Sequence, residues 1–340
     1  MTDTAFSFTI PDTLNASEPA EYRGRNREDV KLMVLDRLTG KTRHGEFSDI
    51  SAYFHPGDVL VLNRSRTMPS QFQAKVLGES YEMRLAREVE DGVWEVLLLP
   101  DALKIGTTIT LADGYSAEVV GEGSESPLQT VKFELAGEKL LSFFYQYGAP
   151  VYYEYITEPW PLDAYQTVYS SVPGSVEMTS AGRPFSWRTL NALRNQGVQI
   201  AFLELHTSLS YYSHNRWPTP SSHPENYHIP KETTEMIERA AREGNRVIAA
   251  GTTVVRALES AAVSPRGTLH YGKGVSRLYI DRHHELKVVN GLITGFHEPE
   301  ASHLDLLTAI VSEKYLMEAY QVAIDQHYLW HEFGDINLIM

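Results

Sequence analysis

Residues 246–260 carry the sequence Arg-Val-Ile-Ala-Ala-Gly-Thr-Thr-Val-Val-Arg-Ala-Leu-Glu-Ser. The apolar run Val247–Ala250 predicts a buried strand that ends at Gly251, and Thr252 or Thr253 is expected to cap the helix that follows. A strand that turns directly into a helix leaves free backbone N–H groups above the carboxyl edge of a sheet. The turn therefore favours a polar or anionic small ligand, with an ordinary capped helix as the alternative.

The same alternation of strands and helices continues on both sides of this stretch. Apolar runs at 198–205 and 292–296 predict two further strands, and helices are expected after Ser186, after Pro230 and over 304–323. We therefore predict an α/β main domain whose mostly parallel, barrel-like sheet is covered by helices. The carboxyl ends of parallel strands meet at one edge, so residues near those ends are expected to line one cleft: Ser180, Gly182, His206, Thr252, Thr253 and His297.

The pattern of the sequence changes between residues 70 and 149, from alternating strands and helices to short β-rich runs. Short β-rich runs occupy 72–77, 81–85, 93–99, 107–111, 117–120 and 130–135, and glycine-containing turns separate them. Even spacing of short strands is typical of a small β-barrel or sandwich. We predict that residues 70–149 form an inserted β-barrel domain, and that 1–69 and 150–340 form the main domain.

Composition limits the class of protein. The chain has 340 residues, is 42% hydrophobic and contains no cysteine, which excludes disulfides and thiolate metal sites. Its sequence contains neither an apolar run of about 18 residues nor a signal-peptide pattern, so we expect a cytoplasmic protein without a membrane partner.

The net charge of −14 makes the chain a poor non-specific binder of nucleic acid. Local basic groups are present nevertheless. Arg23, Arg25 and Arg27 cluster near the start, and Arg64 and Arg66 follow a predicted strand at 58–63. These arginines are candidates for phosphate contacts, and solvated surface charge is the alternative.

A series of motifs then follows along nearly the whole chain. In order they are Met33-Val-Leu-Asp-Arg37, Gly57-Asp-Val-Leu-Val-Leu-Asn63 with Arg66, Tyr165-Gln-Thr-Val-Tyr169, Ala181-Gly182 with Phe185, Leu205-His206, Gly251-Thr-Thr with Arg256 and Glu259, Phe296-His297 with Pro299, and Phe333-Gly-Asp335. Taken together, this order resembles the S-adenosylmethionine:tRNA ribosyltransferase-isomerase family of queuosine biosynthesis.

The resemblance implies a transferase-isomerase with S-adenosylmethionine as co-substrate. The ribosyl group would pass to a 7-aminomethyl-7-deazaguanine base in tRNA and isomerise to the epoxycyclopentane of epoxyqueuosine, while adenine and methionine leave. Such chemistry needs a base that removes a ribosyl proton next to the sulfonium. The alternatives are a paralogue that shares the adenosyl pocket but uses another, small-molecule acceptor, and a binding module without catalysis. The oligomeric state and the acceptor are left open by the sequence.

This chain departs from the family pattern at several positions. The family's Pro-Thr-Ala-Gly-Leu-His-Phe-Thr stretch is Thr179-Ser-Ala-Gly-Arg-Pro-Phe-Ser186 here, so that Arg183 replaces an apolar residue and Pro184 a histidine. The family's Asn-Phe-His-Leu-Pro-Lys is Gly295-Phe-His-Glu-Pro-Glu300, which places Glu298 and Glu300 where leucine and lysine are usual. We expect these changes to lie at the site and to weaken tRNA binding, because carboxylates repel phosphate.

Two histidines are the candidate catalytic residues, because an imidazole exchanges protons near neutral pH. They are His206 and His297, and hydrogen-bonded structural histidines are the alternative. The candidate substrate-binding residues are Asn63, Arg66, Tyr165, Gln166, Ser180, Gly182, Gly251, Thr252, Thr253 and Arg256. Arg256 suits a ligand carboxylate or phosphate, and an ion pair with Glu259 is its alternative role. The spacing of His206, His223, His228 and His297 matches no metal pattern, so no metal is predicted.

Overall fold

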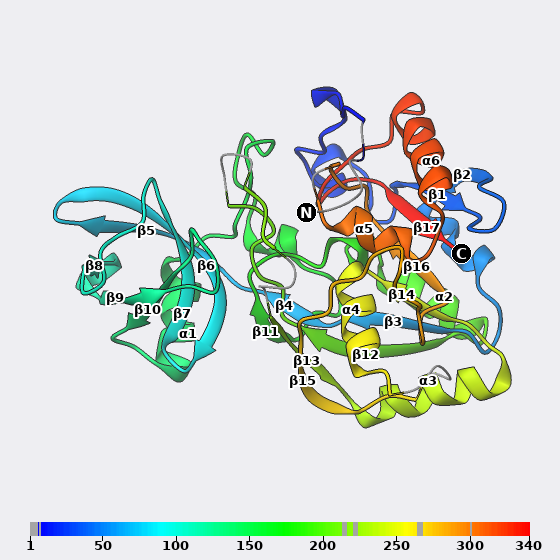
Figure 1. Cartoon of the computed structure of the whole chain (residues 1–340). Coiled ribbons are helices and arrows are strands. Elements are labelled where there is room, and N and C mark those ends of the chain that lie inside the picture. The colour runs from blue at the N-terminus through cyan, green and yellow to red at the C-terminus, as the bar shows by residue number, and fades with distance from the viewer. Residues whose placement is uncertain (1–5, 7, 213–215, 220–223, 264–267, 300) are drawn as a thin grey trace.

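The computed structural model describes residues 6, 8–212, 216–219, 224–263, 268–299 and 301–340. It consists of a large mixed sheet with helices on both faces and a closed β-barrel beside it (Figure 1). In the described part of the chain, no helix is long and apolar enough to span a bilayer.

The large sheet has nine strands in the order β15 (Gly272–Ser276), β13 (Glu225–Ile229), β12 (Gln199–Leu205), β3 (Val59–Asn63), β14 (Val247–Ala250), β16 (Gly291–Thr294), β17 (Ile336–Ile339), β1 (Lys31–Leu35) and β2 (Thr42–Glu46). Its centre, β12–β3–β14–β16, is parallel, as is the pair β17–β1. The remaining pairs are antiparallel. The α/β prediction is confirmed. The large sheet is mixed and is not closed into a barrel, and its parallel part consists of the central strands and the pair β17–β1.

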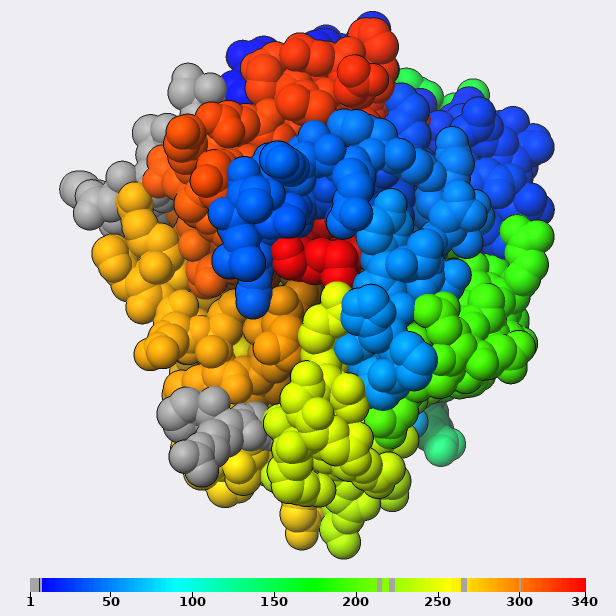
Figure 2. Space-filling view, turned by 90° about the vertical axis from the view of Figure 1, so that its right-hand side faces the viewer, coloured from blue at the N-terminus to red at the C-terminus, as the bar shows by residue number. Residues whose placement is uncertain are grey.

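Both faces of the central sheet are buried, which explains the continuous apolar runs in its strands. On β3, Val59 and Val61 pack in one core with α3 (Lys231–Glu243), α4 (Thr252–Ala261), α5 (His303–Thr308) and α6 (Glu313–Asp325). Leu60 and Leu62 point to the other core, which contains α2 (Trp187–Asn195). Figure 2 shows the face turned away from the barrel, on which the C-terminal strand in red lies recessed between blue N-terminal segments and the yellow-green α3.

The predicted helix boundaries agree closely with the structure. Ser186 caps α2 by accepting a hydrogen bond from the backbone N–H of Thr189, and Gly244 ends α3 in the left-handed conformation with φ 74°. The region expected to be helical over 304–323 is two helices, because Ser312 caps a new helix, α6, after α5 has ended.

The six β-rich runs form the six barrel strands. These are β5 (Gln71–Val76), β6 (Glu79–Glu90), β7 (Val93–Leu99), β8 (Thr108–Thr110), β9 (Ser116–Glu122) and β10 (Gln129–Phe133), closed in the order β10-β7-β6-β5-β8-β9. Helix α1 (Gly137–Tyr147), which the sequence analysis did not predict, packs Phe143 and Phe144 into the barrel core. The inserted β-barrel is therefore confirmed, while the domain boundaries at 69/70 and 149/150 stay a prediction.

A small parallel sheet lies between the barrel and the large sheet. It pairs β4 (Ser65–Thr67) with β11 (Val172–Ser175), in a region that Figure 1 shows next to the barrel. The apolar core of the barrel does not stop at its own strands. It also contains side chains from the segments that follow the barrel in the sequence, namely Val151, Tyr153, Val176, Leu209 and Tyr212.

Candidate functional site

A cavity of about 620 Å³ opens at the carboxyl ends of the central parallel strands. Its wall includes Ser208 after β12, Gly251 after β14 and His297 after β16. The volume is in the range of ordinary small-molecule sites. Of the predicted site residues, those that line it are Ser180, Gly251, Thr252, Thr253, Arg256 and His297.

The turn at Gly251 has the geometry of a helix start, but not the predicted cap. Gly251 itself is the N-cap of α4 with φ 100°, a conformation that favours glycine, and its N–H donates to the carbonyl of Ile293 at 2.8 Å. Neither threonine caps the helix with its side chain. The first amides of a helix have no partner within it, so the start of α4 brings free N–H groups and the side chains of Thr252 and Thr253 to the cavity.

Arg256 lies one turn into α4 and is incompletely paired. Its Nη1 forms an ion pair with Glu225, so the predicted alternative partner, Glu259, is wrong. Nε and Nη2 are buried and have no hydrogen-bond partner among the described residues. Buried donors without partners are costly, and a guanidinium binds carboxylate and phosphate oxygens well. The side chain is therefore suited to an anionic group of a bound ligand.

His297 lies in the wall and stacks on His303, with ring centroids 4.5 Å apart. Its Nε2 is 2.8 Å from the hydroxyl of Thr294. Burial, reinforced by the neighbouring His303, lowers the pKa of His297 to about 3. The ring is therefore neutral at neutral pH, where it is a weak base and can exchange hydrogen bonds with a ligand.

Glu177 is a cavity residue that the sequence analysis missed. One carboxylate oxygen, Oε1, accepts hydrogen bonds from the hydroxyl of Tyr153 and from the backbone N–H of Ser210, the latter at 2.7 Å. Burial raises the pKa of Glu177 to about 7, against the opposing effect of these two hydrogen bonds. Glu177 stands two residues before Thr179-Ser180, and only its acidic side chain beside that motif could have drawn attention to it.

Two further acidic side chains, Glu298 and Glu332, line the cavity beside His331. His331 Nδ1 is 2.8 Å from Glu298 Oε1, and the ring of His331 stacks on Tyr155 with centroids 3.9 Å apart. The hydroxyl of Tyr155 donates to Glu332. Burial opposes ionisation of Glu298, but the hydrogen bond and charge of His331 outweigh it and lower the pKa of Glu298. Glu298 lies in the cavity wall, as its position in the motif predicts, and the lowered pKa keeps its carboxylate ionised.

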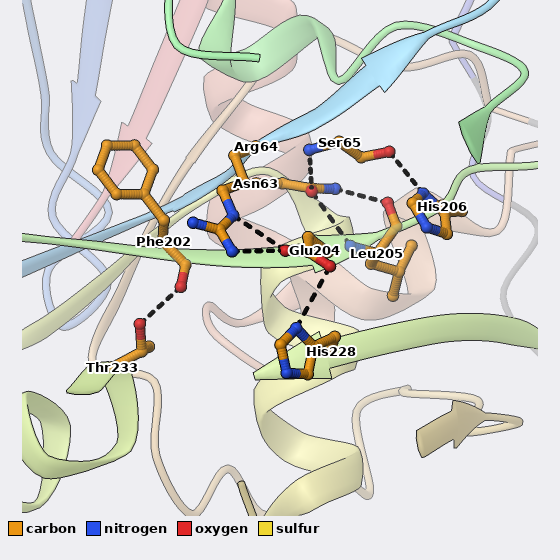
Figure 3. Close-up of polar contacts among 9 residues, drawn as sticks. All are labelled: Asn63, Arg64, Ser65, Phe202, Glu204, Leu205, His206, His228 and Thr233. Carbon is orange, nitrogen blue, oxygen red and sulfur yellow. Dashed lines mark hydrogen bonds and ion pairs between the residues drawn. The ribbon is translucent and has the colours of Figure 1, made fainter. Parts of the chain in front are cut away.

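Two predicted residues lie next to β12 and not in the described wall of the cavity (Figure 3). Asn63 is buried, and its Oδ1 accepts from the N–H groups of Ser65 and Leu205 while its Nδ2 donates to the carbonyl of Leu205. His206 Nδ1 is 2.7 Å from the hydroxyl of Ser65, and burial lowers the pKa of this imidazole. Both side chains hold β3, β4 and β12 together, and Thr207–Tyr211, which follow His206, line the cavity instead.

Four more predicted residues are also absent from the described wall. Gln166 is buried and its side-chain amide bonds to the backbone N–H and carbonyl of Thr67. Tyr165 packs on Phe333, and a side chain at Gly182 would collide with the hydroxyl of Tyr169. Arg66 on β4 is partly exposed, and its side chain has no hydrogen bond or ion pair with any described residue. Tyr165 and Gly182 thus have packing roles, Gln166 fixes the backbone of β4, and the side chain of Arg66 can contact a ligand.

The departures from the family pattern divide into two groups. Arg183 is buried, forms an ion pair with Glu21 at 3.0 Å and lies over the ring of Phe333, and neither it nor Pro184 belongs to the described cavity wall. The expectation that this stretch alters the site is thus wrong for these two positions. Glu298 does line the cavity, and Glu300 lies outside the described residues.

Most of the basic cluster is already paired within the chain. Arg64 binds Glu204, which also contacts His228 (Figure 3). Arg27 pairs with Glu21, and Arg23 donates to the carbonyl of Phe333. Because these arginines already have partners within the chain, they are less available for phosphate contacts than their sequence positions indicate. His223 lies outside the described residues, and within the described ones no group of three or more histidine or acidic side chains is arranged for a metal ion.

The fold is an α/β domain with an inserted barrel, and its cavity lies at the carboxyl ends of the central strands. The family model described as "Queuosine biosynthesis protein" matches residues 3–339. The chain is 35% identical to the S-adenosylmethionine:tRNA ribosyltransferase-isomerase of Thermotoga maritima and 33% identical to that of Carboxydothermus hydrogenoformans, over 98% of each chain. The crystal structure of S-adenosylmethionine tRNA ribosyltransferase from Thermotoga maritima is similar, with a TM-score of 0.57 and 30% identity over 99% of this chain and 100% of the other. The chain belongs to the queuosine biosynthesis protein family.

Proposed function

We propose that this protein transfers the ribosyl group of S-adenosylmethionine to a queuosine precursor in tRNA and isomerises it. The observation that carries the proposal is the match to the family and its curated relatives over nearly the whole chain, together with the cavity at the strand ends. The acceptor would be 7-aminomethyl-7-deazaguanine at the wobble position and the product epoxyqueuosine, with adenine and methionine released.

The cavity offers complementary groups for S-adenosylmethionine. The two unpartnered donors of Arg256 and the free amides at the start of α4 suit the carboxylate of the methionine end. Glu177, Glu298 and Glu332 line the same cavity and favour positive charge, which the sulfonium and the ammonium carry. Since His297 is neutral at neutral pH, it suits a hydrogen bond to a polar group of the ligand.

Adenine release tests the proposal directly. The protein is incubated with S-adenosylmethionine and tRNA that carries the precursor base, and free adenine and the modified nucleoside are measured by chromatography. Adenine should appear with precursor-bearing tRNA and not with tRNA that carries guanine at that position. Arg256→Met should raise the KM for S-adenosylmethionine, whereas Arg239→Met on the outer part of α3 should not. Absence of adenine with both tRNAs would contradict the proposal.

A second candidate is the same donor chemistry with a small-molecule acceptor. It is favoured by Glu298, which places a carboxylate in the cavity wall where the family has leucine, and by the pairing of Arg64 and Arg27 inside the chain. Adenine release with the free precursor base but not with tRNA would select this candidate. An open cavity of about 620 Å³ argues against a module that has lost its ligand site.

A further inference from the structure

Glu177 is held at the cavity by bonds at both its backbone and its side chain. Its N–H donates to the hydroxyl of Thr207 at 3.2 Å, and that hydroxyl donates to the carbonyl of Glu177 at 2.6 Å. These two bonds fix the segment after β11 to the end of β12. The side chain reaches the cavity from this fixed point, so its position does not depend on a free loop.

The carboxylate of Glu177 is oriented by its hydrogen bonds. Oε1 accepts from both Tyr153 and Ser210, which sets the plane of the carboxylate. The side chain of Ser210 also stabilises the ionised carboxylate, and Glu177 is only partly buried and lines the cavity. The carboxylate is therefore anchored through Oε1 at the wall of the cavity.

We propose that Glu177 is the base of the reaction, whose Oε2 takes a proton from the ribosyl carbon bonded to the sulfonium; this inference rests on the proposed function. In this step the C–H bond breaks and an O–H bond forms on Oε2. The electron pair stays on the carbon, where the adjacent sulfonium stabilises it. The proton returns to solvent from Oε2 after turnover, so the step needs no further reactant.

The electrostatic setting suits this role better at Glu177 than at the histidines. Burial raises the pKa of Glu177 to about 7, which gives a carboxylate that is basic and still ionised in part at neutral pH. The pKa of His297 is lowered to about 3, and burial also lowers that of His303. The charged and titratable groups that face Glu177 are Tyr153, Glu332 and Tyr212, which come from three separate segments.

Tyr153 acts through Glu177 as a positioning residue. Its hydroxyl stabilises the ionised carboxylate and so holds the pKa of Glu177 below the value that burial alone would give. Tyr153→Phe should therefore raise that pKa. If the ionised carboxylate is the base, activity rises with pH through the pKa, and in Tyr153→Phe this rise should move to higher pH. A purely structural tyrosine would lower the rate without moving the pH profile.

The test compares isosteric variants of Glu177. Glu177→Gln keeps an oxygen for Tyr153 and Ser210 but cannot accept the proton, so kcat for adenine release should fall roughly 100-fold or more with little change in KM. Glu177→Asp should restore part of kcat. Glu158→Gln, an exposed carboxylate outside the described cavity wall, is the matched control and should retain the wild-type rate. A wild-type pH profile and kcat in Glu177→Gln, or a loss confined to Glu332→Gln, would overturn the proposal.

A binding measurement separates this proposal from the proposed function. A cation beside Glu177 lowers its pKa, so binding of S-adenosylmethionine near neutral pH should release protons. Calorimetry in buffers with different heats of ionisation counts those protons, and Glu177→Gln should abolish the release while binding persists. Proton release without any adenine formation by the wild type would refute the proposed function. Adenine formation with an unchanged proton count in Glu177→Gln would refute the role of Glu177 alone.

Discussion

Replacement of Glu259 by glutamine tests whether this residue of the Gly251-Thr-Thr motif stabilises the fold. Glu259 is buried on α4, and its carboxylate accepts three backbone N–H groups from the segment before β16. Oε2 accepts from Lys287 at 2.9 Å, and Oε1 accepts from Val288 and Val289 at 3.0 and 3.1 Å. The residue therefore ties the helix at the cavity to the strand that leads to His297.

The expected loss follows from the donor count. A glutamine at 259 can keep its oxygen toward Val288 and Val289, but its NH2 group then faces the N–H of Lys287, which loses its acceptor. Nε2 of His284 lies 3.6 Å from Oε2, outside hydrogen-bond distance of the present side chain. A buried donor without a partner costs about 1–3 kcal/mol, and the two remaining bonds lose their charge assistance. Relief of the desolvation cost of the carboxylate offsets part of this. We expect the free energy of unfolding to fall by about 2 kcal/mol.

Urea unfolding followed by tryptophan fluorescence measures this change. The midpoint should fall while the m-value stays the same, because the surface exposed on unfolding is unchanged. Glu238→Gln on α3, a carboxylate without a hydrogen bond to the described residues, serves as the control. A loss below about 0.5 kcal/mol, which is ordinary for a surface substitution, would refute the assigned role of Glu259.

Three further results are expected. Thr252→Val removes a hydroxyl from the cavity wall and should weaken S-adenosylmethionine binding by about 1–3 kcal/mol, measured by calorimetry; unchanged affinity would leave Thr252 without a ligand role. The pKa of Asp58 is lowered, because its hydrogen bonds to Arg246 outweigh burial, so its contribution to stability is present above the ordinary value of 3.8 and lost as pH falls through the lower folded pKa. Asp58→Asn should thus destabilise the protein at neutral pH, and its urea midpoint should converge with the wild type under acid conditions. The affinity for tRNA should fall steeply with salt concentration, and Arg66→Ala should reduce the slope of log affinity against log salt by about one. Glu298→Leu with Glu300→Lys should strengthen tRNA binding. Tight, salt-insensitive binding by the wild type would contradict this.

Much of the fold could be predicted because local signals and tertiary packing agree. Val247–Ala250 is apolar on both faces, and the structure buries it in the centre of the sheet. The barrel strands were found because turns separate them. The edge strand Gly272–Ser276 and its neighbour Glu225–Ile229 were missed, since both are partly exposed and their sequences lack apolar periodicity.

The candidate site was predictable mainly where a strand end fixed it. Gly251, Thr252 and His297 follow central strands and line the cavity. Glu177 and Tyr153 come from irregular segments that reach the cavity through long-range contacts, which no periodicity indicates. The structure places Asn63 outside the described wall of the cavity, because a side chain that completes the bonding of neighbouring strands has the same sequence appearance as one that binds substrate.

The barrel core and the cavity share side chains. Tyr153 and Leu209 pack with the barrel interior and also line the cavity. A ligand that fills the cavity thus rests against the side chains that attach the barrel to the rest of the molecule. Occupancy should slow amide hydrogen exchange in barrel strands that do not contact the ligand, so exchange in the barrel would measure ligand binding at the cavity.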